Sequence, residues 1–296
     1  MSRRGELTLP IPSHDEDFPV VQYADDTLLV VPAVEPQLLA LKNMLRTFSE
    51  STGLKVNFHK SSIIPINVDN TETRRLADVF GCQVGSLPFT YLGLPLGTTR
   101  PRIQDLVPVV QRVERRLSAS SSLLSRGARL QLVQSVLSSM PIYFLCSLCL
   151  PDGIIKQLER IMRQCLWRGN SDTPRQPLAP LPLVCRPKVN GGMGIINLSI
   201  QNIALLTKHL FKFYNKVDIP WVNLMWNSYY ERIVPHATVL CGSFWWRDVL
   251  KLSEIFGLHS MVNVNWETQH YSGMMLGLSW VLQPLSRTNF QGYFRM

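Results

Sequence analysis

The fold of the first part of this chain is decided by the stretch Phe18-Pro19-Val20-Val21-Gln22-Tyr23-Ala24-Asp25-Asp26-Thr27-Leu28-Leu29-Val30-Val31. Residues 18–23 and 27–31 are rich in the apolar and β-branched residues that favour strands. Between them lies the short polar segment 24–26, which suits a tight turn. The stretch therefore predicts a β-hairpin with two exposed carboxylates at its tip, whose apolar strands pack on a following helix.

Paired carboxylates at a hairpin turn are well placed to hold a divalent cation. Mg²⁺ is a hard ion that takes oxygen ligands, and two such ions can align an attacking hydroxyl with a triphosphate. Aspartate is also common in ordinary turns. Taken alone, residues 23–26 favour the ordinary turn over the metal site.

The remaining periodicity predicts an α+β chain, mixed in its first half and mainly helical after residue 100. Gly53 is expected to end the first helix as a C-cap, and Thr71 to begin the second as an N-cap. Residues 91–97 suit a second small hairpin, and the proline-rich residues 169–182 a loop or linker. The apolar spacing predicts helices over residues 35–51, 71–80, 105–120, 127–140, 152–168, 199–216 and 243–256.

Composition narrows the partners. The chain has 296 residues, of which 46% are hydrophobic, and a formal net charge of +9. Such a balance favours a polyanionic partner, nucleic acid first; a basic protein with no special partner remains the plain alternative. No stretch of about 18 apolar residues or signal peptide is seen, so no membrane association is expected.

Six cysteines are too few for a disulfide scaffold in a chain of this length, which fits a reducing compartment inside the cell, nuclear or cytoplasmic. Cys146 and Cys149 form a lone C-x-x-C within an apolar run. No second pair or nearby histidine completes a metal set. We therefore expect buried structural thiols here rather than a zinc or redox site.

Five segments, in order, resemble the reverse transcriptases of plant LINE-type (non-LTR) retrotransposons over residues 18–256. Residues 21–27 are similar to the metal-binding hairpin of the family's palm. The others are similar to the next palm motif, the primer grip, the start of the thumb and a downstream conserved block. In that order they are Gly53-Leu54-Lys55-Val56-Asn57 with Lys60-Ser61, Tyr91-Leu92-Gly93-Leu94-Pro95-Leu96-Gly97, Leu124-Ser125-Arg126-Gly127-Ala128-Arg129-Leu130, and Cys185-Arg186-Pro187-Lys188 with Gly191-Gly192-Met193-Gly194-Ile195.

The resemblance implies a partial polymerase palm with β-hairpins, followed by a mainly helical thumb and connection region. The implied activity is RNA-directed DNA synthesis from deoxynucleotides, with Mg²⁺ and an RNA or DNA template-primer. Asp25 and Asp26 would be the catalytic metal ligands, and Tyr23 would pack near the primer terminus. Lys60, or failing it Lys55, would approach the triphosphate. The primer backbone would be positioned by Tyr91, Leu92, Gly93 and Leu94. The plain alternatives are solvated lysines and a core Tyr91.

Charge supports the thumb independently. Residues 100–130 hold seven arginines, opposed only by Asp105 and Glu114. Arginine suits phosphate contacts through its planar fork, whereas a generic solvated face more often mixes lysine and glutamate. We expect a primer-template surface that includes Arg112, Arg115, Arg126 and Arg129. The seven arginines are Arg100, Arg102, Arg112, Arg115, Arg116, Arg126 and Arg129.

The chain departs from the family at both ends. The family uses a further aspartate on an earlier palm strand, for which residues 1–22 leave no room. Asp17 would lie about 26 Å from Asp25 along a strand. We therefore expect a polymerase fragment that is catalytically incomplete alone and binds Mg²⁺ weakly. A non-catalytic nucleic-acid-binding module and a remnant without function are the alternatives. The oligomeric state is left open.

The resemblance fades near residue 257, where the family continues into a Leu-Phe-Trp-Asp segment. One permitted set of codons for residues 265–275, read from the third base of the first codon, encodes Leu-Gly-Asn-Thr-Ala-Leu-Phe-Trp-Asp-Asp. Our hypothesis is that residues 257–296 are a frameshifted tail without a selected fold. The expected domains are thus a flexible lead-in (1–17), the partial palm (18–100), the thumb and connection (101–256) and this tail.

Overall fold

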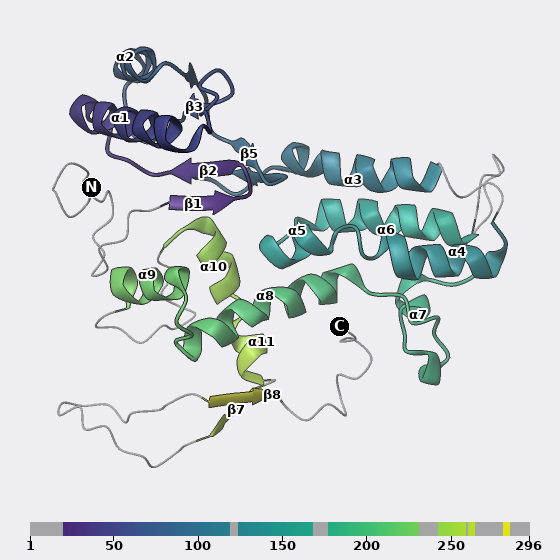
Figure 1. Cartoon of the computed structure of the whole chain (residues 1–296). Coiled ribbons are helices and arrows are strands. Elements are labelled where there is room, and N and C mark those ends of the chain that lie inside the picture. The colour runs from purple at the N-terminus through teal and green to yellow at the C-terminus, as the bar shows by residue number, and fades with distance from the viewer. Residues whose placement is uncertain are drawn as a thin grey trace. The chain divides into compact units, whose positions relative to one another are not determined.

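The computed structural model describes residues 20–118, 124–167, 177–230 and 242–258, and the backbone of two short strands at 260–263 and 281–284 (Figure 1). The chain has an α+β fold, as predicted. Its contacts divide it into two compact units, residues 1–97 and 98–296. The predicted boundary between palm and thumb, at residues 100 and 101, lies close to this division.

The first unit combines two helices with three two-stranded sheets. Strands β1 and β2 form an antiparallel hairpin, β3 and β4 pair in parallel, and β5 and β6 form a second hairpin. Both hairpins were predicted and are confirmed. The elements are β1 (Val20–Tyr23), β2 (Asp26–Leu29), α1 (Glu35–Thr52), β3 (Ser62–Ile63), α2 (Asn70–Phe80), β4 (Gln83–Val84), β5 (Phe89–Tyr91) and β6 (Leu94–Leu96).

Helix α1 confirms the helix predicted over residues 35–51, and its C-cap is Gly53 as expected. Gly53 adopts φ 76°, and its N–H donates to the Ser49 carbonyl. The start of α2 corrects the prediction. The N-cap is Asp69, whose carboxylate accepts a hydrogen bond from the N–H of Thr71 at 2.9 Å. Both residues are acceptable N-caps, and the carboxylate has the added advantage of its charge at the positive end of the helix.

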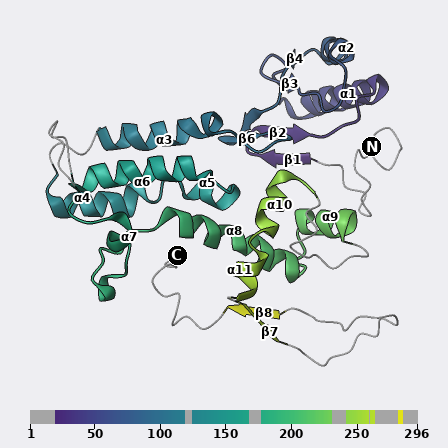
Figure 2. The same ribbon diagram turned by 180° about the vertical axis from the view of Figure 1, so that it is seen from behind.

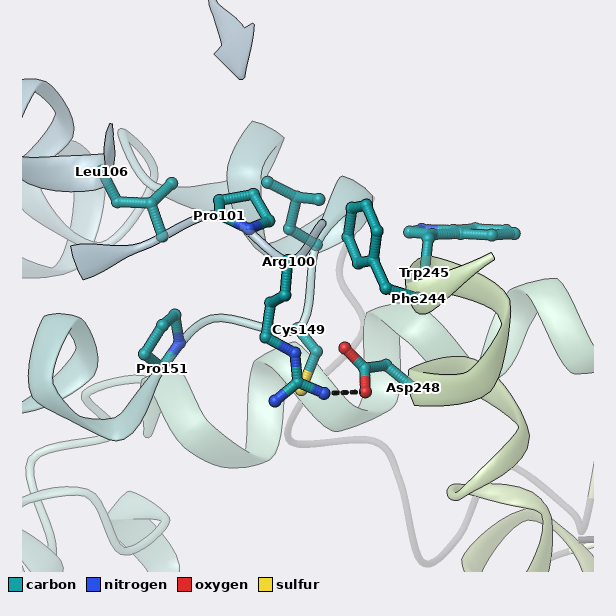
Figure 3. A pocket seen from close by; sticks show the side chains of 9 residues that line it. Arg100, Pro101, Leu106, Cys149, Pro151, Phe244, Trp245 and Asp248 are labelled. Carbon is teal, nitrogen blue, oxygen red and sulfur yellow. Dashed lines mark hydrogen bonds and ion pairs between the residues drawn. The ribbon is translucent and has the colours of Figure 1, made fainter. Parts of the chain in front are cut away.

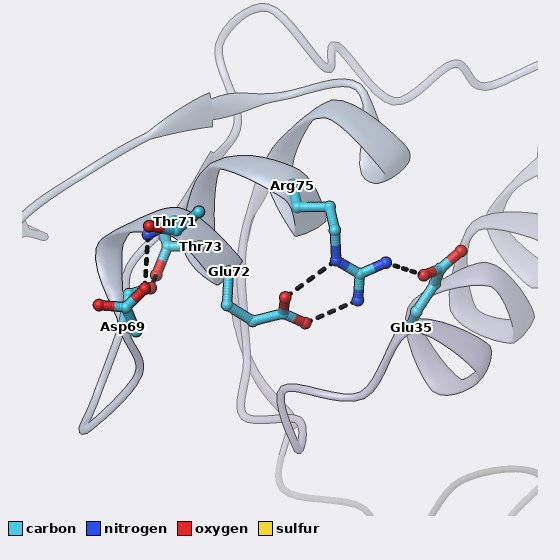
Figure 4. A network of polar contacts seen from close by, with 6 residues as sticks. All are labelled: Glu35, Asp69, Thr71, Glu72, Thr73 and Arg75. Atoms are coloured by element: carbon cyan, nitrogen blue, oxygen red, sulfur yellow. Dashed lines mark hydrogen bonds and ion pairs between the residues drawn. The ribbon is translucent and has the colours of Figure 1, made fainter.

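An arginine ties the two helices together (Figure 4). Arg75 on α2 donates to both carboxylate oxygens of Glu72, at 2.9 and 2.7 Å, and also pairs with Glu35 in the first turn of α1. These bonds raise the pKa of Arg75 above its usual value, and the Arg75 hydrogen bond lowers that of Glu72. Beneath this network lies the core of the unit, formed by Leu38, Leu41, Leu76 and Phe80.

The second unit is mainly helical. Helix α3 packs along α6, and both views show the two side by side (Figures 1 and 2). The elements are α3 (Ile103–Ser118), α4 (Arg126–Leu132), η2 (Val133–Leu137), α5 (Ile142–Ser147), α6 (Asp152–Trp167), α7 (Leu181–Val184), η3 (Lys188–Asn190), α8 (Leu198–Tyr214), α9 (Pro220–Tyr229), α10 (Phe244–Leu250), α11 (Ser253–Leu258), β7 (Ser260–Asn263) and β8 (Val281–Pro284).

Two helices predicted as continuous are interrupted. The helix expected over residues 127–140 turns into a π-helix at η2. There both the N–H and the hydroxyl of Ser138 donate to the Val133 carbonyl, at 3.0 and 2.7 Å. The hydroxyl bond supports this wider turn, because serine can compete for helix carbonyls. The helix expected over residues 243–256 is divided at Lys251 into α10 and α11.

An aromatic cluster forms the core where α8, α9 and α10 meet. Phe213 on α8 is fully buried and stacks on Trp226, with ring centroids 4.7 Å apart. Trp246 on α10 is also fully buried, and its indole N–H donates to the Tyr230 hydroxyl at 2.7 Å. These rings explain how short helices with weak periodicity hold together, because each buries a large apolar area.

Much of the tail after residue 258 lies outside the described residues, so its predicted poor packing stays a prediction. Strands β7 and β8 pair there in antiparallel fashion. The described run Arg126–Ser147 is long and apolar enough, by length and composition alone, to cross a membrane. One such run is weak evidence, since the core helix of a soluble protein passes the same test. The predicted absence of a membrane partner stays a prediction.

Candidate functional site

The tip of the first hairpin presents the two predicted carboxylates. Tyr23 faces Asp26 across the strands, so the connection is the two-residue turn Ala24–Asp25. Ala24 adopts φ 52°, in the left-handed region that residues with a Cβ rarely occupy. Asp25 and Asp26 are exposed, and the Tyr23 side chain is 64% exposed. The turn therefore displays both carboxylates and the ring of Tyr23 to solvent.

The hairpin is anchored through its second side alone. Leu29 and Val31 pack against the core of α1 and α2. Val20 and Val21 on β1 are 45% and 52% exposed. The expectation that both strands pack on α1 was therefore wrong for β1, because no other described layer covers that strand. The carboxylate turn is held at the end of β2, which is the anchored strand.

The donors at the turn are too few for a complete metal site. Among the described residues, no cluster of three or more histidine, cysteine, aspartate or glutamate side chains could hold a metal ion. Two carboxylates leave most positions of an octahedral Mg²⁺ ion to water. The residues present therefore do not fit a tightly held catalytic metal, and no chemical step can be assigned to one here.

The two candidate triphosphate lysines follow α1 in an exposed loop. Asn57 holds this loop: its side-chain oxygen accepts from the Lys60 N–H at 3.2 Å, and its carbonyl accepts from the Ser61 hydroxyl at 2.9 Å. Phe58 anchors the loop edge-on against Phe80, with centroids 5.5 Å apart. Lys55 and Lys60 are both exposed. The backbone of Lys60 is thus fixed while its side chain reaches solvent.

The predicted primer-grip residues lie on the second hairpin. Tyr91 pairs with Leu94, and the turn residues Leu92 and Gly93 have φ values of 50° and 82°. Two successive left-handed residues are the mark of a type I′ turn. The Tyr91 ring is half-buried, and its hydroxyl is buried without a hydrogen-bond partner among the described residues. The core alternative for Tyr91 therefore has structural support, whereas Leu92 and Gly93 are exposed.

The thumb arginines divide into exposed and structural ones. On α3, Leu106, Val109, Val110 and Val113 form the buried stripe. Arg112, Arg115 and Arg116 lie outside this stripe and are exposed, as is Arg126 at the start of α4. These positions could contact a phosphate backbone together.

Arg129 differs from its neighbours. It is half-buried, and its Nε donates to the Leu124 carbonyl at 3.0 Å. The residue therefore closes the segment that leads into α4. Its positive charge also opposes the effect of burial on Cys165, whose pKa is raised to about 11.

Arg100 is also committed to the protein (Figure 3). Its guanidinium pairs with the carboxylate of Asp248 on α10, which is 7% exposed. The two residues border a small hollow beside Cys149, Pro151 and Phe244. With a volume of about 10 Å³, the hollow has room for about one water molecule and none for a nucleotide.

A basic stripe on α6 was missed from the sequence. Lys156 and Arg160 are exposed, and Arg163 is partly exposed. Glu159 lies beside them; burial raises the pKa of this carboxyl, against the effect of Arg163 and Lys156. The spacing i, i+4, i+7 placed these three cations on one face of a predicted helix, so the signal was present in the sequence.

The cysteine prediction needs correction. Cys146 is half-buried and Cys149 is exposed, and both are free thiols. The C-x-x-C begins in the last turn of α5 and continues beyond it, so the apolar run around it does not bury both side chains. Burial nevertheless raises the pKa of the Cys149 thiol.

No family model matches the chain. A protein of Arabidopsis thaliana that is provisionally named a ribonuclease H protein is 28% identical over 161 residues, which cover 53% of this chain. The aligned part is 26% of the Arabidopsis protein, so the chain spans about a quarter of the length of this curated relative.

Proposed function

We propose that this chain is the palm and thumb part of a reverse transcriptase from a LINE-type retrotransposon, which binds nucleic acid but does not polymerise alone. The observation that carries the proposal is the hairpin turn of Tyr23, Ala24, Asp25 and Asp26, anchored to α1 through β2. The motifs that follow it are in the order of the family, and each occupies a turn or loop at the surface of its unit.

Charge supports the nucleic-acid part of the proposal. The exposed arginines of α3 and α4 and the basic stripe of α6 belong to the same unit, in a chain of net charge +9. Phosphate contacts by such side chains give affinity without reading sequence. The Arabidopsis relative bears the name of a ribonuclease, which agrees with a nucleic-acid partner.

The donor set supports the absence of independent catalysis. Two exposed carboxylates would hold Mg²⁺ weakly and leave the triphosphate without a complete ion pair to align it. A primer-extension assay with a homopolymer RNA or DNA template, deoxynucleotides and Mg²⁺ tests this point. We expect no incorporation by the parent chain. Extension that disappears in Asp25→Asn would overturn the proposal and require another ligand.

Binding separates this proposal from a remnant without function. We expect the parent chain to bind a template-primer duplex at low salt, with affinity that falls steeply as salt rises. An equal affinity for unrelated sequences is also expected, because the exposed cations contact phosphate. A chain that folds but shows no salt-dependent binding would contradict the nucleic-acid assignment.

A further inference from the structure

The segment between α7 and α8, residues 185–195, forms a tightly bonded loop. The N–H groups of Gly192, Met193 and Gly194 donate to the carbonyls of Pro187, Val184 and Arg186, at 3.1, 2.9 and 3.0 Å. The side chain of Gln134 in η2 donates to the Met193 carbonyl at 2.6 Å. The loop is therefore fixed both internally and to a neighbouring helix, and its shape is set before any partner arrives.

Glycine is required for this shape. A Cβ added at Gly192 would lie 2.0 Å from the Arg186 carbonyl oxygen, a backbone atom that cannot move away easily. Gly191 adopts φ 77°, which disfavours residues with a Cβ. The glycine run thus folds the chain back on residues 186–188 and pushes η3 outward.

The fixed loop carries an apolar tip between two cations. Val189 is 92% exposed, the most exposed of the large apolar side chains in the described residues. Arg186 and Lys188 beside it are exposed. The ends of the loop are buried through Cys185 and Ile195. An apolar side chain held in water on a rigid support has a cost that a contact with a partner would remove.

The charge around the tip identifies the partner. From Thr173 to Val217 the sequence contains no aspartate or glutamate, and every ionised side chain apart from histidine is positive. The six cations are Arg175, Arg186, Lys188, Lys208, Lys212 and Lys216. An acid-free stretch of this length is suited to a polyanion and not to a mixed protein surface.

We propose that residues 186–190 are a second nucleic-acid contact, a rigid finger distinct from the arginines of α3 and α4. Arg186 and Lys188 contact two phosphates, and Val189 packs against the sugar or base edge between them. Proteins that bind nucleic acid commonly place an apolar side chain among cations in this way. The inference rests on the proposed function, because it names a further surface for the same polyanion.

The test measures binding of the full chain to a fluorescent template-primer duplex across a salt series. We expect Arg186→Ala/Lys188→Ala to lower the slope of log K against log salt by about 0.7–0.9 for each phosphate lost. The matched control is Lys208→Ala/Lys212→Ala, which removes the same charge from α8 in the same acid-free stretch. An equal loss in this control would overturn the finger, because net charge alone would then explain the effect.

A second measurement does not depend on charge. A photo-crosslinking amino acid at Val189 should crosslink to the labelled duplex, whereas the same group at Phe48, an exposed apolar position on α1, should crosslink much less. Absence of the crosslink at Val189 in folded protein would overturn the proposal, and so would crosslinking only to an added protein. Gly192→Ala, which distorts the loop, should reduce the crosslink without removing any cation.

The outcomes also separate this inference from the proposed function. If Arg112→Ala/Arg115→Ala/Arg126→Ala weakens binding and the finger variants do not, the finger fails and the proposed function stands. If the parent chain does not bind the duplex at all, both fail together.

Discussion

The guanidinium of Arg100 is paired with the carboxylate of Asp248, 148 residues further along the chain. Lys251 lies on the other side of the same carboxylate oxygen, at 3.5 Å. The pair joins the segment before α3 to α10, so it closes the second unit on itself. Arg100 is therefore a structural residue of this unit and does not belong to the proposed phosphate surface.

Removing Arg100 should destabilise the second unit more than its own exposure suggests. Arg100→Ala leaves the buried Asp248 with Lys251 alone, and a buried charge that loses its partner is costly. Because Arg100 is half exposed, solvent screening reduces the loss, and we expect about 1–2 kcal/mol. Urea unfolding followed by tryptophan fluorescence measures it, since all seven tryptophans lie after residue 97.

The double variant Arg100→Ala/Asp248→Asn serves as the control. With the carboxylate neutral, the missing guanidinium should matter less, so the double variant should lose less stability than the sum of the single ones. Strict additivity would mean that the pair does not stabilise the unit.

The buried amide of Asn202 should be among the most sensitive positions in α8. Its oxygen accepts from the Leu150 N–H at 3.0 Å, and its nitrogen donates to the carbonyls of Leu145 and Leu148, each at 2.8 Å. Asn202→Ala leaves three buried backbone groups without this partner, and we expect a loss of about 2–4 kcal/mol. Asn202→Asp, which keeps the oxygen and lacks the donors, should also be destabilising, as measured by the same urea unfolding. A change below about 0.5 kcal/mol in both variants would show that water replaces the amide.

Acid should destabilise the second unit through His209. Its Nε2 donates to the Cys146 carbonyl at 3.1 Å, while Nδ1 is buried without a partner among the described residues. Burial lowers the pKa of His209 below its usual 6.5, and Lys208 and Lys212 add to this. The stabilising contribution of neutral His209 is therefore present above pH 6.5 and is lost as the pH falls toward the lowered pKa of the folded state.

A pair of histidine variants isolates this effect. The parent chain should lose more stability between about pH 7 and pH 5 than His209→Gln, in which the titrating group is absent. His59→Gln, which replaces an exposed histidine of the first unit, should follow the parent. If His209→Gln loses as much as the parent, another group controls the acid sensitivity.

Local patterns in the sequence predicted the hairpins well, because their signals lie within a few residues. Tyr23 and Asp26 flank the first turn, and Leu92 and Gly93 supply the left-handed residues of the second. The α1 helix and its cap at Gly53 were predicted for the same reason. Helix interruptions were missed, since the π-turn depends on which carbonyl the Ser138 hydroxyl reaches.

Long-range contacts decided the part of the site that the sequence could not predict. Arg100 and Arg112 look equivalent in a run of arginines, yet only Arg100 has a distant carboxylate facing it. Arg129 differs from Arg126 through a carbonyl five residues before it. The basic stripe of α6 could have been read from its spacing, because Lys156, Arg160 and Arg163 repeat with the helical period.

The most direct test of the central claim is the affinity of the chain for a template-primer duplex as a function of salt. The parent chain should bind with a steep negative slope and no sequence preference. Arg112→Ala/Arg115→Ala/Arg126→Ala should weaken binding and flatten the slope by about 2–3, at unchanged stability. Arg100→Ala, whose arginine is committed to Asp248, should leave the slope of the folded protein unchanged. Binding by the triple variant that equals the parent at every salt concentration would contradict the account.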